Sequence, residues 1–228
     1  MAKHIGIVAV SPEGAALFYR QIARHAAESL APAECPRLSL HNEPLALYIE
    51  ALNAQDWHTI GQLLRKSAEA LARCGAQFCL TPDNAIQHGI HLAEVGSPIP
   101  WVTMTDLVSQ AIVQDGRKKV GLIGTKAVTY GSAYQTSLGL KGITVLAPEP
   151  DEADFMNRVI FDELIFGIIK AESQARVLQI IGHLADRGCE GVILGSSETP
   201  LLVTEHNCTL PVYDSVDLLA IGAVKAAI

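Results

Sequence analysis

A ten-residue pattern occurs twice in the chain and limits the folds that the chain can adopt. The first copy runs from Gly75 to Asn84 and the second from Gly188 to Ser197, at a constant spacing of 113 residues. Each copy has the composition of a short buried strand that runs directly into small polar residues and a carboxylate. Open parallel sheets carry their chemistry at such strand ends. The repeat therefore predicts two related halves, each with a functional strand end.

Strands alternate with helices in both halves. Apolar, β-branched runs at 3–10 and 119–125 predict the first strand of each half, and each run is followed by a helical pattern. Further strands are expected near 37–40, 143–146 and 210–213, and helices at 15–30, 56–73, 84–94, 127–138, 151–169, 172–187 and 214–228. This alternation predicts an α/β protein with two similar lobes, each a parallel sheet flanked by helices, related by pseudo-two-fold symmetry.

The crossing between the halves is expected at the turn-rich segment 96–100, which contains two prolines and a glycine. The predicted N-terminal lobe comprises 1–98 plus 209–228, and the predicted C-terminal lobe comprises 99–208. The site is expected in the crevice between the two lobes.

Composition and charge argue against several classes of protein. The chain of 228 residues is 49% hydrophobic and 18% charged, which allows one large core or two small ones. Its formal charge of −7, without a basic patch, argues against nucleic acid as the main partner. No apolar run approaches the ~18–20 residues of a membrane span, and the first residues lack the pattern of a signal peptide. A cytoplasmic protein that does not bind a membrane is therefore expected.

No cofactor or metal is expected from the motifs. The loop after the first strand, at 11–14, is not a GxGxxG sequence and carries no Walker lysine. The eight histidines show no metal-ligand spacing, and His88 and His91 have the pattern of a solvated helix surface. The five cysteines form no CxxC pair, and their odd number indicates reduced thiols.

The second copy of the pattern resembles a known family. Segment 188–202 is similar to the sequence Gly-Cys-x-Gly-Val-Ile-Leu-Gly-Cys-Thr-Glu-Leu-Pro-Leu-Leu of the pyridoxal-independent aspartate/glutamate racemases, which include hydantoin racemases and related decarboxylases and isomerases. Segments 120–134, 160–164 and 211–214 extend the resemblance over essentially the whole chain. The resemblance implies a cofactor-independent isomerase and a homodimer. It also implies two acid/base residues, one at the end of each motif strand, which work on opposite faces of the substrate's α-carbon.

The chain differs from this family at both of those positions, because Asp83 and Ser196 stand where the resemblance implies cysteines. Cys79 and Cys189 lie too far back along their strands to replace them, and they are predicted to be small core residues. An ionised Asp83 is available as a base, whereas an unassisted serine is neither a useful base nor a good acid. Exchange of the α-proton is therefore expected to be slow or one-sided. For Asp83, a helix N-cap is an equal alternative.

Seven further residues are expected to contact the substrate, because the resemblance places them at strand ends that hold its carboxylate and amino groups. They are Ser11, Asn42, Asn84, Ala85, Thr125, Ser197 and Glu198. Taken singly, residues of these types serve more often as caps or turn formers. The segment 42–44 contains no arginine, where some dicarboxylate-specific relatives carry one, which argues against aspartate or glutamate as the substrate.

Two functions and one artificial explanation follow from these residues. The first function is a racemase or epimerase with an altered acid/base pair, acting at the α-carbon of a small carboxylic acid or amino acid. The second is a catalytically silent homologue that binds a small carboxylate. The artificial explanation is laboratory replacement of cysteine, which fits at most one position, because cysteine-to-aspartate is not a usual trapping substitution.

Overall fold

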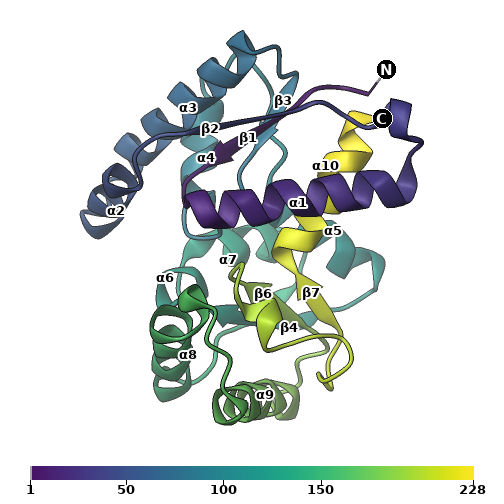
Figure 1. Ribbon diagram of the computed structural model, residues 1–228. Coiled ribbons are helices and arrows are strands. Elements are labelled where there is room, and N and C mark those ends of the chain that lie inside the picture. Colours follow the sequence, from purple (N-terminus) through teal and green to yellow (C-terminus); the bar gives the residue numbers. More distant parts are fainter. Residues whose placement is uncertain (1) are drawn as a thin grey trace. The chain divides into compact units, whose positions relative to one another are not determined.

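The chain forms two compact units in the computed structural model, which describes residues 2–228. Unit 1 comprises the described residues up to Met104 together with Val216–Ile228, and unit 2 comprises Thr105–Ser215. Each unit contains one parallel sheet with helices packed against it (Figure 1). The expected fold class, an α/β protein with two parallel sheets flanked by helices, is confirmed.

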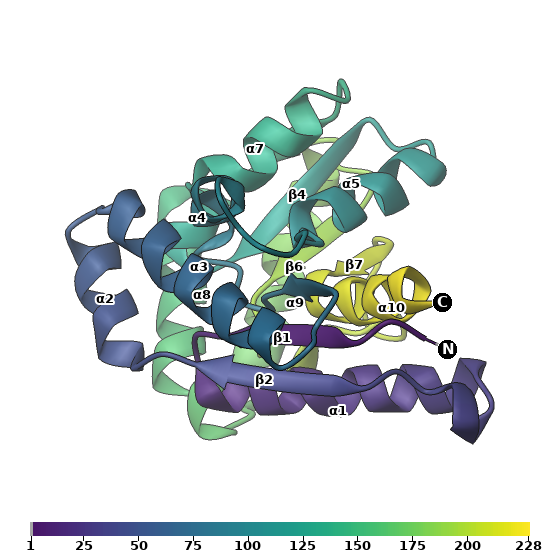
Figure 2. The same cartoon turned by 90° about the horizontal axis from the view of Figure 1, so that it is seen from above.

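Unit 1 is built on a three-stranded parallel sheet in the order β2-β1-β3. Its elements are β1 (Ile5–Ala9), α1 (Pro12–Ser29), η1 (Pro32–Glu34), β2 (Leu38–Asn42), α2 (Leu45–Asn53), α3 (Trp57–Arg73), β3 (Phe78–Leu80), α4 (Gln87–Glu94) and, from the end of the chain, α10 (Ser215–Ala227). Helix α1 lies on one side of β1 and β2, and α3 with α4 lies on the other (Figure 2). All five residues of β1 are buried, as expected for a strand covered on both faces.

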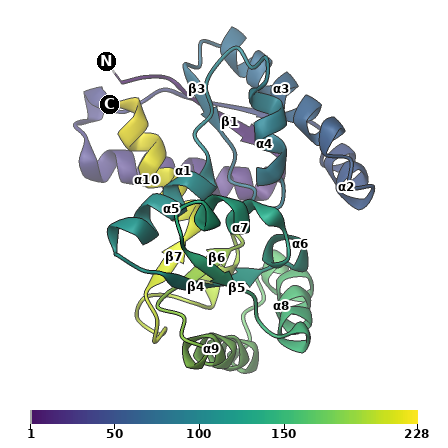
Figure 3. The same cartoon turned by 180° about the vertical axis from the view of Figure 1, so that it is seen from behind.

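Unit 2 is built on a four-stranded parallel sheet in the order β5-β4-β6-β7. Its elements are α5 (Met104–Gln114), β4 (Lys119–Gly124), α6 (Lys126–Thr129), α7 (Ser132–Gly139), β5 (Thr144–Leu146), α8 (Pro150–Asp162), η2 (Leu164–Phe166), α9 (Ala171–Asp186), β6 (Val192–Gly195), η3 (Thr199–Leu201) and β7 (Val212–Asp214). Helices α7 and α9 lie on opposite sides of this sheet, as Figure 3 shows from behind.

The sequence repeat has the same packing in both units. In unit 1 the central strand presents Gly6 to α3, where an added Cβ would lie 3.1 Å from Leu71 Cδ1. In unit 2 the central strand presents Gly121 to α9, where an added Cβ would lie 2.7 Å from Leu184 Cδ1. In each unit the motif strand therefore follows a helix that approaches the central strand closely.

The turn that leads into each motif strand is also the same. Gly75 follows α3 with φ of 89°, and Gly188 follows α9 with φ of 86°. This left-handed conformation is the usual way to end a helix, and glycine adopts it without the steric cost of a Cβ. The repeat therefore preserves the helix end as well as the strand.

The predicted lobe boundaries differ from the observed units in one element. The strand near 210–213 was expected in the N-terminal lobe, with 209–228, but β7 pairs with β6 in the sheet of unit 2. Tyr213 of this strand packs against Gly191 and donates a hydrogen bond from its hydroxyl to Asp115 Oδ2 at 2.7 Å. An unpaired edge of β6 would leave backbone groups without partners, and β7 satisfies them. Only α10 returns to unit 1.

Several helix predictions also differ from the structure. Helices α2 and α5 were not predicted, the expected helix 127–138 is divided into α6 and α7, and α8 ends at Asp162 rather than continuing to 169. A short 3-10 turn follows α8, and Gly167 closes it with φ of 70°. No helix among residues 2–228 is long and apolar enough to span a membrane.

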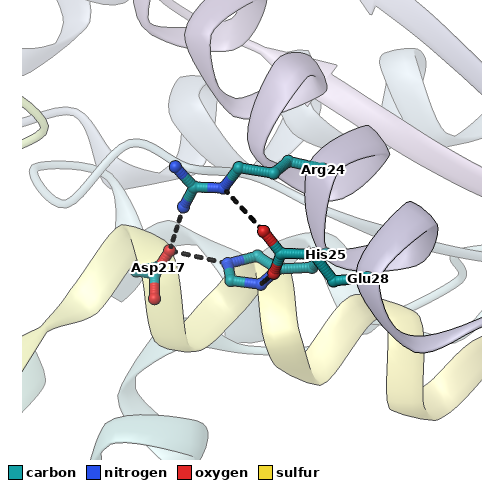
Figure 4. Close-up of polar contacts among 4 residues, drawn as sticks. All are labelled: Arg24, His25, Glu28 and Asp217. Atoms are coloured by element: carbon teal, nitrogen blue, oxygen red, sulfur yellow. Dashed lines mark hydrogen bonds and ion pairs between the residues drawn. The ribbon is translucent and has the colours of Figure 1, made fainter.

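Helix α10 contacts α1 through a cluster of four polar side chains (Figure 4). Asp217 Oδ1 lies 2.7 Å from His25 Nε2 and 3.4 Å from Arg24 Nη2. Glu28 lies on the outer side of the cluster, 3.6 Å from His25 Nδ1 and 3.9 Å from Arg24 Nε. The His25 side chain is 15% exposed, whereas Arg24 and Glu28 are about 60% exposed, so the His25–Asp217 contact is the shielded one.

We expect Asp217→Ala to destabilise the protein by about 1–2 kcal/mol, because it removes the shielded contact and a negative charge from the first turn of α10. Asp217→Asn should cost less, since the amide oxygen still accepts a hydrogen bond. Glu28→Ala is the matched control and should cost only about 0.2–0.5 kcal/mol. Urea denaturation of the variants measures these differences, and equal losses for Asp217→Ala and Glu28→Ala would contradict the assignment.

Candidate active site

Polar residues follow all three strands of unit 1 at the same edge of the sheet. Ser11 follows β1, Asn42 ends β2, and Asp83 lies three residues after β3. The strands are parallel, so their carboxyl ends open on one edge. The structure therefore brings these three predicted site residues to one edge of the sheet.

Two of these residues have structural partners there. Ser11 caps α1, because its Oγ accepts a hydrogen bond from the backbone N–H of Gly14 at 3.3 Å. Asn42 Nδ2 donates to the carbonyl oxygens of Ala9 at 3.2 Å and Glu43 at 2.7 Å. Asn42 therefore links the ends of β1 and β2. Ser11 and Asn42 both stabilise the backbone at this edge of the sheet.

Asp83 lies in the loop between β3 and α4 and is not a helix N-cap. Helix α4 begins at Gln87, with Ile86 in the capping position. Asp83 Oδ1 instead accepts a hydrogen bond from the backbone N–H of Ala85 at 2.9 Å, which forms a local turn. The alternative role as a cap was therefore wrong, and so was the helix start at residue 84.

Hydrogen bonds from the Gln87 side chain fix the loop around Asp83. Gln87 Nε2 donates to the carbonyl oxygens of Asp83 at 2.8 Å and Thr81 at 3.2 Å. Asn84 is buried, and Ala85, another predicted contact residue, is partly buried and supplies its N–H to Asp83. The carboxylate of Asp83 therefore projects from a fixed loop.

A buried polar group beside this edge was missed from the sequence. Glu43 is 8% exposed and its Oε2 lies 3.0 Å from Lys66 Nζ. Burial raises the pKa of the Tyr48 phenol well above its ordinary range, and the negative charges of Glu43 and Asp83 act in the same direction. Tyr48 therefore stays protonated beside two carboxylates. Glu43 could have been found in the sequence as an acidic residue directly before Pro44. Tyr48 could not be placed, because it lies in helix α2, which was not predicted.

The corresponding edge of unit 2 follows two strands that approach each other closely. Gly124 ends β4 and pairs with Gly195 at the end of β6, and a Cβ on Gly124 would lie 2.8 Å from the carbonyl oxygen of Gly195. Thr125 and Ser196 follow these glycines directly. Thr125 opens α6 through its carbonyl, and its side chain makes no capping bond.

Ser196, Ser197 and Glu198 form a connected group at this edge. Ser196 is 6% exposed, and its Oγ donates a hydrogen bond to Glu198 Oε2 at 2.6 Å. Ser197 Oγ donates to Glu198 Oε1 at 2.9 Å. The backbone N–H of Glu198 donates to Ser196 Oγ at 3.2 Å. Ser196 was expected to be unassisted, but its hydroxyl is hydrogen-bonded to the side chain of Glu198.

The two cysteines near the motif ends are core residues, as predicted. Cys79 and Cys189 are buried in the apolar clusters of their units. Burial raises the pKa of both thiols, which keeps them in the neutral form. Within residues 2–228, no group of three or more His, Cys, Asp or Glu side chains could hold a metal ion.

The chain is similar to known proteins in sequence and in fold. The family model for Asp/Glu/hydantoin racemases matches residues 7–222. The chain is 28% identical to a candidate Asp/Glu racemase from Yersinia pestis, with 99% of both chains covered and a TM-score of 0.92. It is also 28% identical to an aspartate racemase homologue from Pyrococcus horikoshii, with 99% of both chains covered and a TM-score of 0.88.

More distant solved structures share the fold. A glutamate racemase from Francisella tularensis, solved with D-glutamate, is 15% identical, with 98% of this chain and 79% of that chain covered and a TM-score of 0.67. Because the family model matches nearly the whole chain, the protein belongs to the Asp/Glu/hydantoin racemase family.

Proposed function

We propose that this protein is a cofactor-independent racemase or epimerase that acts at the α-carbon of a small carboxylic acid or amino acid. The observation that carries the proposal is the equivalent placement of Asp83 and Ser196. Each lies just beyond the motif strand of its unit, and each motif strand pairs with the central strand of its sheet. Family membership supplies the reaction class.

The chemistry needs one group that removes the α-proton and another that returns a proton to the opposite face. A carboxylate such as Asp83 serves as a base without further activation. A free serine hydroxyl does not, and it needs an adjacent base to become reactive. The altered pair is therefore unequal: Asp83 acts by itself, and Ser196 depends on its neighbours.

The substrate that we propose is a small α-substituted carboxylic acid rather than specifically aspartate or glutamate. Residues 42–44 include no arginine, which some dicarboxylate-specific relatives carry there, and Lys66 is already paired with Glu43 at 3.0 Å. A second acidic group on the substrate would therefore have to compete with Glu43 for Lys66.

A silent homologue that binds a small carboxylate is the second candidate. Ser196 favours it, because a serine hydroxyl stands where the resemblance implies a thiol. The two candidates differ in whether the α-proton exchanges with solvent.

We expect the unaltered protein to exchange the α-proton of its substrate with deuterium, and Asp83→Asn to slow racemisation by about 10²–10⁴-fold, because the variant lacks a base. Proton NMR in deuterated water, with optical rotation, follows both quantities over a panel of small 2-substituted acids. Asp151→Asn, at an exposed position in unit 2, is the matched control and should keep full activity. Racemisation that is insensitive to Asp83→Asn would place the chemistry elsewhere, and no exchange with any acid would favour the silent homologue.

We also propose a cytoplasmic homodimer. The segment after α8 supports a covered surface, because Phe166 is 69% exposed and Ile169 is 55% exposed. All five cysteines are free, which accords with a reducing compartment.

Sedimentation at micromolar concentration should therefore give a species of twice the 24.4 kDa chain mass. Phe166→Ser should shift it towards the chain mass, because it removes apolar area from the segment after α8 that we expect a second copy to cover. Leu140→Ser is the control, since Leu140 is also exposed but lies outside that segment. A single 24.4 kDa species for the unaltered protein would contradict the homodimer.

A further inference from the structure

Glu198 is fixed at the carboxyl end of β6 by contacts with both preceding residues. Its two carboxylate oxygens accept separate hydrogen bonds, from Ser196 Oγ at 2.6 Å and from Ser197 Oγ at 2.9 Å. The backbone N–H of Glu198 returns a hydrogen bond to Ser196 Oγ at 3.2 Å. The Glu198 side chain therefore has a defined position against the one hydroxyl that the family resemblance places in the acid/base role.

These contacts give Ser196 two features that an isolated serine lacks. The 2.6 Å separation lies in the range of charge-assisted O–H···O⁻ bonds, so the hydroxyl proton points at a group that can take it. The N–H of Glu198 points at the oxygen that would gain negative charge when the proton leaves. A serine with a carboxylate base and an N–H donor is equipped to move a proton.

We infer that Ser196 and Glu198 together form the second acid/base of the site, with Glu198 holding the proton and Ser196 transmitting it. This inference rests on the proposed racemase function, in which Ser196 exchanges a proton with the substrate. It replaces the expectation of one-sided exchange, because the second face of the substrate gains a competent group.

For one enantiomer, the Asp83 carboxylate removes the α-proton and becomes a carboxylic acid. The carbanion takes a proton from Ser196 Oγ, and Ser196 takes the proton of the Glu198 carboxylic acid. For the other enantiomer every transfer is reversed: Ser196 Oγ removes the α-proton while its own proton passes to the Glu198 carboxylate, and Asp83 returns a proton. Ser196 is unchanged in both directions, and one proton is exchanged between Asp83 and Glu198.

Opposite enantiomers therefore depend on opposite carboxylates for loss of the α-proton. We expect Glu198→Gln to slow racemisation by about 10²-fold or more and to stop deuterium uptake from one enantiomer while the other still exchanges. Asp83→Asn should show the reverse preference. Glu205→Gln, at an exposed position seven residues further on, is the matched control and should leave both enantiomers unaffected.

This pattern separates a chemical role from a structural one. If Glu198 only maintained the turn, its replacement would slow exchange of both enantiomers alike, and that result would overturn the inference. Retained racemisation in Glu198→Gln would also overturn it. Circular dichroism confirms that each variant is folded before exchange is measured.

A second measurement tests the pair without relying on catalysis. In Ser196→Cys, the introduced thiol should lie against the Glu198 carboxylate, whose negative charge disfavours the thiolate. Adding Glu198→Gln should move the midpoint of iodoacetamide alkylation at position 196 to lower pH by about 1. Peptide mass spectrometry follows that position separately from the native cysteines. Asp214, on the neighbouring strand β7, is present in both variants, so its charge affects both alkylation midpoints equally.

The two measurements distinguish failure of the inference from failure of the proposed function. A shifted alkylation midpoint without exchange of any acid would retain the Ser196–Glu198 pair and reject the racemase. An unshifted midpoint would reject the pair, whatever the unaltered protein does to its substrate.

Discussion

The common direction of the strands within each sheet is the constraint on which the rest of the structure depends. Every β1–β2, β1–β3, β4–β5, β4–β6 and β6–β7 pairing is parallel, so each sheet has a single edge where all its strands end. Parallel pairing requires a crossover between strands, and the helices that provide it cover both faces. Loops beyond the strand ends are therefore the natural place for polar side chains, and Asp83 and Ser196 both lie there.

The two units share a similar backbone arrangement but carry different polar groups at the carboxyl ends of their strands. In unit 1 the edge carries Asp83, held by its own turn, beside the protonated Tyr48 and the Glu43–Lys66 pair. In unit 2 the edge carries a hydroxyl whose character depends on the carboxylate of Glu198. The shared backbone sets the positions of these polar groups, and local hydrogen bonds set their partners. A family signature can thus be retained while the residues at the strand ends differ between the two units.

How much of this was predictable depends on how far apart the interacting residues lie in the sequence. The strand-turn repeat was visible, because Gly75 and Gly188 mark the same helix ends and each precedes a buried strand. The sheet that β7 joins was not visible, because edge pairing is a tertiary choice between two similar sheets. Helix α2 follows a proline and is too short to show a long apolar repeat, so neither this helix nor the position of Tyr48 was predicted. The Ser196–Glu198 contact spans two residues, but only the turn geometry brings their side chains together.

The return of α10 to unit 1 makes unit 2 an insertion within the chain of the other unit. Unit 1 contains β1 near the start and residues 216–228, which hold nearly all of α10, and the backbone N–H of Lys3 donates to the carbonyl of Ala227 at 2.7 Å. On the ribosome, unit 2 can complete its sheet as soon as β7 emerges, whereas unit 1 waits for the helix that follows. Closing so long a loop costs little more entropy than closing a short one. The contacts of α10 with the first residues of unit 1 can therefore form only after all of unit 2 has been synthesised.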